Sequence, residues 1–179
     1  MAPESKEDTQ FIQWLGAEVP SEYATSLDDL IVQSFGGCHL EDLPPPDRRC
    51  VIIDDTSVLA HAGIQSRIFT LHETIYHGFV LGAVCSHPAF RLQGFGTQIV
   101  EYLLSQLPKE EGDFVALNCG ETVTNFYEKM GFCIISPRAG YIRNGVHEID
   151  DDPVMAISLK NDFSVQALEA DVFPMIDEF

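Results

Sequence analysis

Hydrophobic periodicity changes abruptly at Gly94. The preceding stretch, 75–86, is rich in β-branched and aromatic residues, a pattern typical of a strand. After Gly94, apolar residues including Ile99 and Leu103 recur at helical spacing until Pro108 ends the run. A strand that passes through a glycine-containing turn directly into an amphipathic helix indicates a sheet covered by helices, in the α/β or α+β class.

The other elements follow from the same patterns. We expect a mixed, mostly antiparallel central sheet flanked by helices, in one domain over residues 1–179. Residues 1–9 are expected to be disordered and residues 161–179 to form a C-terminal tail. Strands are predicted at 11–15, 51–54, 58–71, 75–86, 114–118, 132–135 and 154–159, and helices at 20–35, 99–107 and 124–130. The proline-rich stretch 38–49 is predicted to be an irregular loop.

The charge balance limits the partners. The chain has 28 acidic and 10 basic residues and a net charge of −18. Because nucleic acids and anionic membranes are bound through Lys and Arg, neither is an expected partner. The negative field would attract amines or polyamines, although the acidity alternatively serves solubility alone. With 45% hydrophobic residues, the chain can bury a core.

Targeting signals and cysteines favour a cytoplasmic protein. The start of the chain does not resemble a signal peptide, and no apolar run is long enough to span a bilayer. Five widely spaced cysteines suggest neither a disulfide framework nor a zinc site. Cys50, Cys85 and Cys133 lie in apolar, strand-like surroundings, where buried reduced thiols are expected.

The turn between this strand and the helix is a candidate anion-binding site. It reads Arg91-Leu92-Gln93-Gly94-Phe95-Gly96-Thr97. Glycines allow close backbone approach, and the free N–H groups of a helix start favour a phosphate or pyrophosphate. The segment is neither a Walker loop nor a complete G-x-G-x-x-G motif. A tight turn without a ligand is the alternative.

A second motif, Asn125-Phe126-Tyr127 followed by Gly131-Phe132, comes about thirty residues later. Together, the two motifs resemble the signatures of the GNAT superfamily of acetyl-CoA-dependent N-acetyltransferases over roughly residues 10–160. The resemblance implies a sheet splayed around acetyl-CoA, between the strand ending near Ser86 and the strand 114–118.

Within that superfamily the chain is similar to aminoglycoside 2′-N-acetyltransferases. The similarity rests on 61–67, 78–84, the acidic run 150–152 and 171–173. One departure concerns the glutamate that those enzymes carry in the fourth strand, which falls here on Val80 or Leu81. The general base is therefore unassigned. The chain also continues beyond Phe173, so a terminal carboxylate role is not carried over.

The resemblance implies a role for Tyr127 as the acid that protonates the departing thiolate; a packed helix aromatic is the alternative. Asn125 would bind pantetheine or cap its helix. The cofactor-binding residues implied are Ala83, Val84, Cys85, Ser86, Arg91, Leu92, Gln93, Gly94, Phe95, Gly96, Thr97, Asn118, Asn125 and Tyr127.

Several further residues are weaker candidates. His77, His87 or Glu73 could act as the base. His72 and His77 nearly form an H-E-x-x-H motif, but their spacing is one residue too long, so no metal is expected. The tail carboxylates Asp171, Asp177 and Glu178 line an amine site or form a solvated end. An acyl-enzyme at Cys85 is disfavoured because an apolar strand makes a poor thiolate.

The sequence therefore predicts direct transfer of an acetyl group from acetyl-CoA to a primary amine, on an aminoglycoside-like or other cationic small molecule. Two alternatives stay open: a non-catalytic acetyl-CoA-binding regulatory module, and an enzyme that acetylates a protein or peptide. A homodimer is also left open.

Overall fold

The computed structural model describes residues 10–108, 111–143 and 145–176. The expectation for residues 1–9 and the candidates Asp177 and Glu178 lie outside the described residues. The chain divides into two compact units. Unit 1 comprises Met1–Gly63 and Ala83–Leu104, and unit 2 comprises Ile64–Gly82 and Ser105–Phe179.

Unit 1 combines strands with two helices. Its elements are β1 (Gln10–Gly16), α1 (Ser21–Ser34), the short 3-10 helix η1 (Leu40–Asp42), β2 (Arg48–Asp54), the first part of β3 (Ser57–Leu71), the end of β4 (Thr74–Ser86), η2 (Pro88–Phe90) and α2 (Phe95–Gln106) up to Leu104. β1 pairs antiparallel with β2, with Leu15 opposite Arg49.

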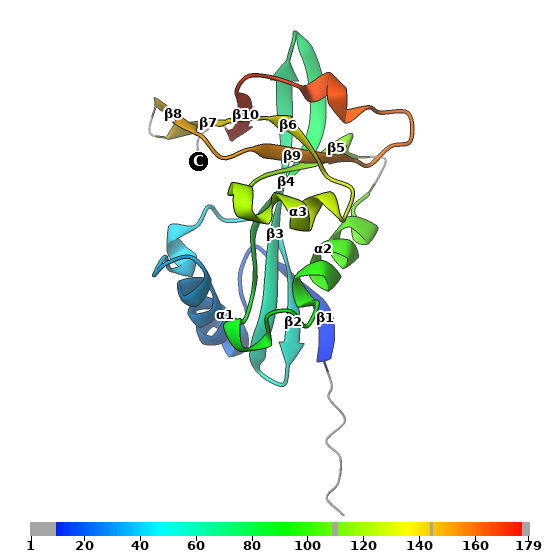
Figure 1. Ribbon diagram of the computed structural model, residues 1–179. Helices are drawn as coiled ribbons and strands as arrows, with labels where there is room; N and C mark the ends of the chain where they lie inside the picture. Colours follow the sequence, from blue (N-terminus) through cyan, green and yellow to red (C-terminus); the bar gives the residue numbers. More distant parts are fainter. Residues whose placement is uncertain (1–9, 109–110, 144, 177–179) are drawn as a thin grey trace, which may run out of the picture. The chain divides into compact units, whose positions relative to one another are not determined.

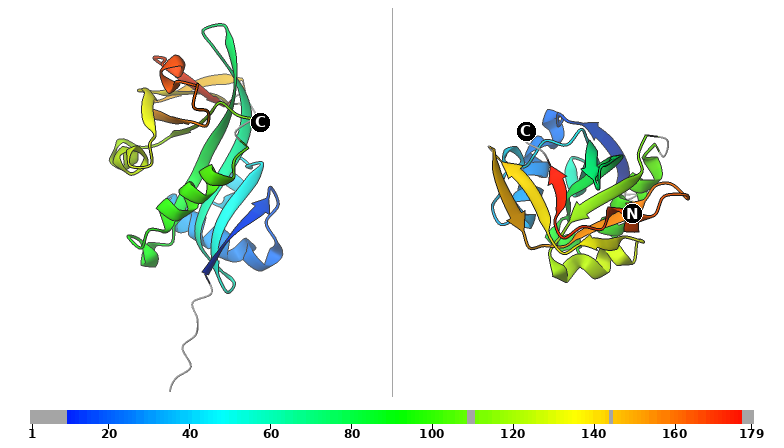
Figure 2. Two further views of the ribbon diagram at one scale, coloured as in Figure 1. Left: turned by 90° about the vertical axis from the view of Figure 1, so that its right-hand side faces the viewer. Right: turned by 90° about the horizontal axis from the view of Figure 1, so that it is seen from above.

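Both faces of the unit 1 strands are covered. Residues 49–53 of β2 are all buried, as expected for a strand between two layers. Leu27 and Ile31 of α1 share a core cluster with Val51 and Ile53 on one face. α1 and α2 stand on the two sides of β2 and β3 (Figures 1 and 2).

Unit 2 contains the remaining strands and a five-residue helix. After the distal parts of β3 and β4 come β5 (Phe114–Asn118), η3 (Glu121–Val123), α3 (Thr124–Glu128), β6 (Cys133–Ser136), β7 (Ala139–Arg143), β8 (Val146–Asp150), β9 (Val154–Ser158), η4 (Val165–Leu168) and β10 (Phe173–Ile176).

Strand order matches the class expected from the sequence. The larger sheet has the order β1-β2-β3-β4-β5-β9-β6, and a smaller sheet has the order β10-β7-β8. β4 and β5 run parallel, whereas β1–β2, β5–β9, β6–β9 and β7–β8 are antiparallel. The pairing of β4 with β5 covers only three residue pairs and ends at Val80 and Ala116.

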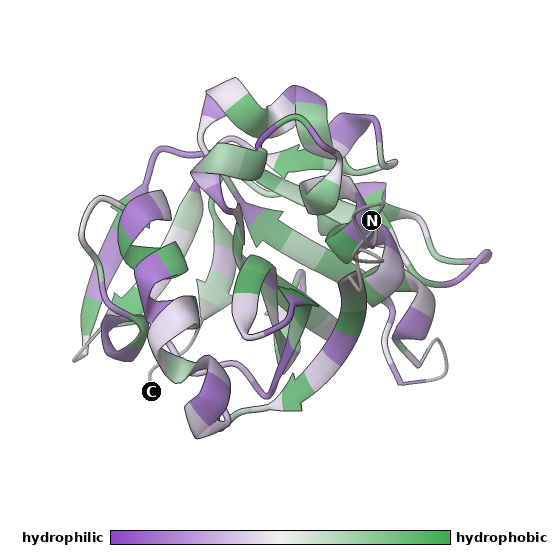
Figure 3. Ribbon diagram, turned by 90° about the horizontal axis from the view of Figure 1, so that it is seen from below, coloured by the Kyte–Doolittle hydropathy of each residue, from purple (hydrophilic) through white to green (hydrophobic). Residues whose placement is uncertain are grey.

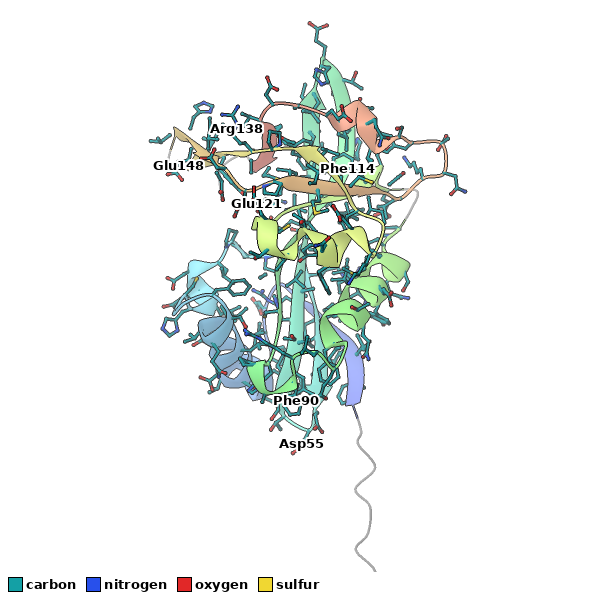
Figure 4. All side chains as sticks on the ribbon, in the orientation of Figure 1. Asp55, Phe90, Phe114, Glu121, Arg138 and Glu148 are labelled. Carbon is teal, nitrogen blue, oxygen red and sulfur yellow. The ribbon has the colours of Figure 1, made fainter. Side chains whose placement is uncertain are left out.

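Aromatic rings fill the core of unit 2. Phe114 of β5, labelled in Figure 4, lies 5.2 Å from Phe69 and 6.3 Å from Phe173 between ring centroids. Phe173 is fully buried and comes from β10, so the C-terminal segment completes this core. Figure 3 shows the strands coloured mostly as hydrophobic and the helices banded with hydrophilic residues.

Several details differ from the sequence-based expectations. The sequence did not predict β7, β8 or β10. The stretch 38–49 contains η1 and the start of β2. Cys133 is exposed, so the expectation of a buried thiol there is wrong, whereas Cys50 and Cys85 are buried as expected. β6 pairs with β9 and ends the larger sheet, so burial depends on a neighbour that the local sequence does not specify.

Candidate active site

The start of α2 presents unpaired backbone donors. The first helical hydrogen bond runs from Gln98 N–H to the Gly94 carbonyl at 2.9 Å. The N–H groups of Phe95, Gly96 and Thr97 precede it and have no acceptor within the described part of the chain, as at any uncapped helix start. Gly94 has φ +88°, which glycine adopts without steric cost. Backbone donors and helix dipole together suit an anionic group.

The loop before α2 is anchored at its other end. His87 N–H donates to the Leu59 carbonyl at 2.8 Å, and His87 Nδ1 accepts from Ala89 N–H at 3.2 Å. Phe90, labelled in Figure 4, packs between the His87 ring at 5.5 Å and the Phe95 ring at 6.3 Å. These contacts hold the loop, while Arg91, Leu92 and Gln93 remain exposed side chains.

The backbone of β4 is irregular at Ala83, which has φ +50° and is therefore strained for a residue with a side chain. The Ala83 carbonyl accepts a hydrogen bond from His61 Nδ1 at 2.8 Å. Because a carbonyl only accepts, the proton of neutral His61 lies on Nδ1. His61 Nε2 is buried without a partner among the described residues.

Burial governs the chemistry of two side chains here. His61 is fully buried, and desolvation lowers its pKa to about 4, so the ring is neutral at pH 7. Desolvation also raises the pKa of Cys85 to about 12. A thiol that stays protonated is a poor nucleophile, which supports the prediction against an acyl-enzyme. Val84 and Ser86, on either side of Cys85, are half-buried.

Unit 2 holds the remaining candidates. Tyr127 lies in α3 with 7% of its surface exposed, and its ring packs on Phe126 at 4.9 Å and Phe132 at 5.6 Å. Asn125 is exposed in the same helix. The residue before α3 is Val123, so the interpretation of Asn125 as a helix cap is wrong. Asn118, at the end of β5, donates through Nδ2 to Asp150 Oδ2 at 3.3 Å.

The residues considered as the general base differ in their position relative to strands β3 and β4. Glu73 is exposed in the two-residue turn between β3 and β4, where it and His72 both have positive φ, as the tight turns that join paired strands often do. His77 is exposed in β4, and its backbone N–H donates to Asp113 Oδ2 at 2.9 Å. Val80 and Leu81 are buried aliphatic side chains, and these two β4 positions therefore supply no base. Asp171 is exposed.

The candidates thus fall into two groups. Ala83–Ser86 and Arg91–Thr97 form one continuous strand, loop and helix start in unit 1, and Asn118, Asn125 and Tyr127 belong to unit 2. The sequence analysis did not assign a role to His61. A histidine inside an otherwise apolar run was the available signal, because a buried polar ring needs a specific partner.

No three His, Cys, Asp or Glu side chains are grouped to hold a metal ion in the described ranges. Across those same ranges, no helix has the length and hydrophobicity needed to cross a membrane.

Comparison with known proteins identifies the class. Residues 46–134, which include β2, β4 and the start of α2, match the family model described as "Acetyltransferase (GNAT) domain". The matched region is therefore a GNAT acetyltransferase domain, as the two sequence motifs predicted, and a domain of this type indicates an acetyl-CoA-dependent acyltransferase.

Solved structures share the fold. The GNAT family N-acetyltransferase YhbS of Escherichia coli, solved with CoA, is 18% identical, with a TM-score of 0.65 over 91% of this chain and 87% of that chain. An acyl-CoA N-acyltransferase from Pseudomonas aeruginosa is 19% identical, with a TM-score of 0.60 over 84% of this chain and all of the other.

A third structure is larger. A probable N-acyltransferase from Enterococcus faecalis is 17% identical and has a TM-score of 0.55 over 71% of this chain, which spans only 33% of that protein. A search of curated protein sequences finds no significant match. The resemblance to aminoglycoside 2′-N-acetyltransferases thus stays a prediction.

Proposed function

We propose that this protein transfers the acetyl group of acetyl-CoA to a primary amine on a small cationic molecule, with aminoglycoside-like compounds within that class. The main observation behind the proposal is the set of unpaired N–H groups at Phe95, Gly96 and Thr97. They lie at the start of α2, which follows β4 and a short loop in the region matched to the GNAT model. Such a helix start fits the pyrophosphate of acetyl-CoA, whose thioester supplies an activated acetyl group.

The residues take the following roles. Backbone N–H groups from Gly94 to Thr97 bind the pyrophosphate, and the exposed Arg91 and Gln93 reach its phosphates. The backbone between Ala83 and Cys85 offers an N–H group to the thioester oxygen, where negative charge develops during attack. Hydrogen bonding by His61 keeps this part of β4 in its strained form.

Tyr127 donates its phenolic proton to the departing thiolate, as the resemblance implies. Asn118 and Asn125 contact the pantetheine arm. The acceptor nitrogen loses its proton to water or to His77, His87 or Glu73, because Val80 and Leu81 replace the glutamate of the aminoglycoside enzymes. We also propose that residues 1–179 act as one N-acetyltransferase domain.

The net charge of −18 supports a cationic acceptor, because a negative field concentrates cations near the protein. A screen of CoA release with aminoglycosides, polyamines, arylalkylamines and peptides tests the acceptor class. Acetylation of a small polyamine or aminoglycoside supports the proposal. Turnover with peptides alone assigns a protein acceptor, and acetyl-CoA binding without turnover by any amine assigns a regulatory module; each of these outcomes overturns it.

Two variants at one position test the cofactor assignment. Gly96→Asp adds a negative charge at the second position of α2, which favours the helix itself but repels a pyrophosphate. We expect this variant to fold and to lose the rise in Tm that acetyl-CoA gives the parent. Gly96→Ala is the control for added bulk and should lose less. If Gly96→Asp binds acetyl-CoA as tightly as the parent, the helix start is not the pyrophosphate site.

A further inference from the structure

Unit 1 contains a pocket of about 580 Å³ that includes none of the residues assigned to acetyl-CoA. Its walls come from the β1–α1 connection, from α1, from the segment 39–45 and from Arg49 of β2. Figure 1 shows the segment 39–45 beside α1. Small-molecule sites in proteins typically occupy about 300–1,000 Å³, so the volume suits a ligand of this kind.

Arg49 is the unusual feature of this pocket. Its side chain is only 6% exposed, and Nε donates to the Ala17 carbonyl at 3.3 Å. The other guanidinium N–H groups have no acceptor, and the side chain has no ion pair, within the ranges that the structure describes. A guanidinium has five N–H donors and stays charged in proteins. Burying such a charge without an anion is costly.

The chain does not lack carboxylates that could have paired with Arg49, because it has 28 of them. Asp28, which also lines the pocket, is engaged elsewhere. Its Oδ2 accepts from His39 Nδ1 at 2.9 Å, and its Oδ1 accepts from the Leu40 N–H at 2.8 Å. Asp28 therefore fixes the wall formed by the segment 39–45. The N–H groups of Arg49 other than Nε–H remain available to a ligand.

The other residues that line the pocket indicate which further groups a ligand would need besides an anion for Arg49. Glu41 is exposed and makes no hydrogen bond or ion pair within the described residues, so its carboxylate can receive an ammonium group. Val19 and Leu43 also line the pocket and supply apolar surface. Glu41 and Asp28 repel a multiply charged phosphate more strongly than a carboxylate, whose single negative charge is balanced by Arg49.

We propose that this pocket binds a small zwitterion of the α-amino acid class, with its carboxylate on Arg49, its ammonium group at Glu41 and an apolar side chain against Val19 and Leu43. Arg49 recognises a planar carboxylate through two parallel hydrogen bonds. The site is independent of the proposed acetyl transfer, because binding requires neither acetyl-CoA nor an acceptor amine.

The first test titrates L-leucine into the protein by calorimetry, without acetyl-CoA. Arg49→Met keeps the apolar stem and removes the charge, and we expect leucine to bind at least about tenfold more weakly. Arg48→Met is the matched control, because the exposed neighbour Arg48 lies over the Trp14 ring at 4.1 Å. This control should bind leucine like the parent. Equal leucine affinity in the parent and Arg49→Met overturns the proposal.

A ligand series needs no substitution at the buried position. Leucinamide lacks the carboxylate and should bind the parent at least about tenfold more weakly than leucine. N-acetyl-leucine lacks the ammonium group, and its affinity should be insensitive to Glu41→Gln, whereas leucine should bind Glu41→Gln more weakly. Glu18→Gln, at an exposed position outside the pocket, is the control.

Absence of leucine binding to the parent at millimolar concentration overturns the proposal, as does leucinamide that binds as tightly as leucine. Failure of acetyl transfer leaves these titrations unchanged. Gly96→Asp, which should lose acetyl-CoA, should bind leucine with the parent's affinity, so the two proposals fail separately.

Discussion

The buried ring of His61 makes the folded state sensitive to mild acid. Its pKa in the folded protein is about 4, against the ordinary value of 6.5, because burial disfavours the charged ring. The unfolded chain therefore binds a proton more readily than the folded chain between these two values. Stability from this histidine is fully present above pH 6.5 and is lost as pH falls toward 4.

The size of the His61 pKa shift determines how much free energy of unfolding is lost at low pH. With pKa values of 6.5 unfolded and about 4 folded, the folded state should lose about 2 kcal/mol between pH 7.5 and pH 5, and about 3 kcal/mol by pH 4. That loss is a large part of the free energy of unfolding of an ordinary domain, which is about 5–15 kcal/mol.

Urea unfolding from pH 7.5 to pH 5 measures this loss. His61→Asn replaces Nδ1 with an amide N–H at a comparable branch position, so it keeps a donor for the Ala83 carbonyl but does not titrate. Other titrating groups cancel in the difference between parent and variant. We expect the parent to lose about 2 kcal/mol relative to His61→Asn over this range.

The exposed His147 is the matched control, and His147→Asn should follow the parent at every pH. Free energies of unfolding that run parallel for the parent and His61→Asn would refute the reasoning. They would show that His61 titrates alike in the folded and unfolded chains, and hence that the ring is not buried neutral.

Three further predictions concern catalysis, packing and charge. Tyr127→Phe should keep acetyl-CoA affinity and lower kcat about a hundredfold, because only the phenolic proton is lost; unchanged single-turnover acetyl transfer would leave the ring with a packing role. Gly78→Ala should destabilise the fold by about 1–3 kcal/mol in urea unfolding, since an added Cβ would lie 2.6 Å from Phe114 Cζ, whereas Gly82→Ala, with nothing within 4 Å, should have little effect. The KM of a cationic acceptor should rise with salt while kcat stays constant, because screening weakens long-range attraction; a KM independent of salt would leave the acidity as a solubility feature.

Local patterns in the sequence were enough to predict the central features of the fold. The change from strand to helical periodicity at Gly94 predicted β4, the loop and α2, since each pattern depends on residues a few positions apart. The second motif placed Tyr127 on a helix, and the two motifs together indicated the GNAT family. Helix 20–35 and the strands before it and after it were predicted for the same reason.

Strand pairing between distant segments, and the burial of single side chains, could be read only from the tertiary structure. β10 pairs with β7 across more than thirty residues of chain, and Phe173 is buried only because that pairing brings it to Phe114 and Phe69. Cys133 sits in an apolar sequence yet is exposed in β6, which has a strand neighbour on one side only.

The same holds for two side chains of unit 1. In the sequence, His61 lies inside the predicted strand 58–71 and Arg49 ends the predicted loop 38–49, and neither pattern indicates that the side chain is buried. The fold buries both, leaves Arg49 without a carboxylate among the described residues and sets His61 against the Ala83 carbonyl. Sequence periodicity specifies which face of an element is apolar, but the partner that covers a polar group comes from distant parts of the chain. Burial and pairing of single charges are therefore properties of the folded protein alone.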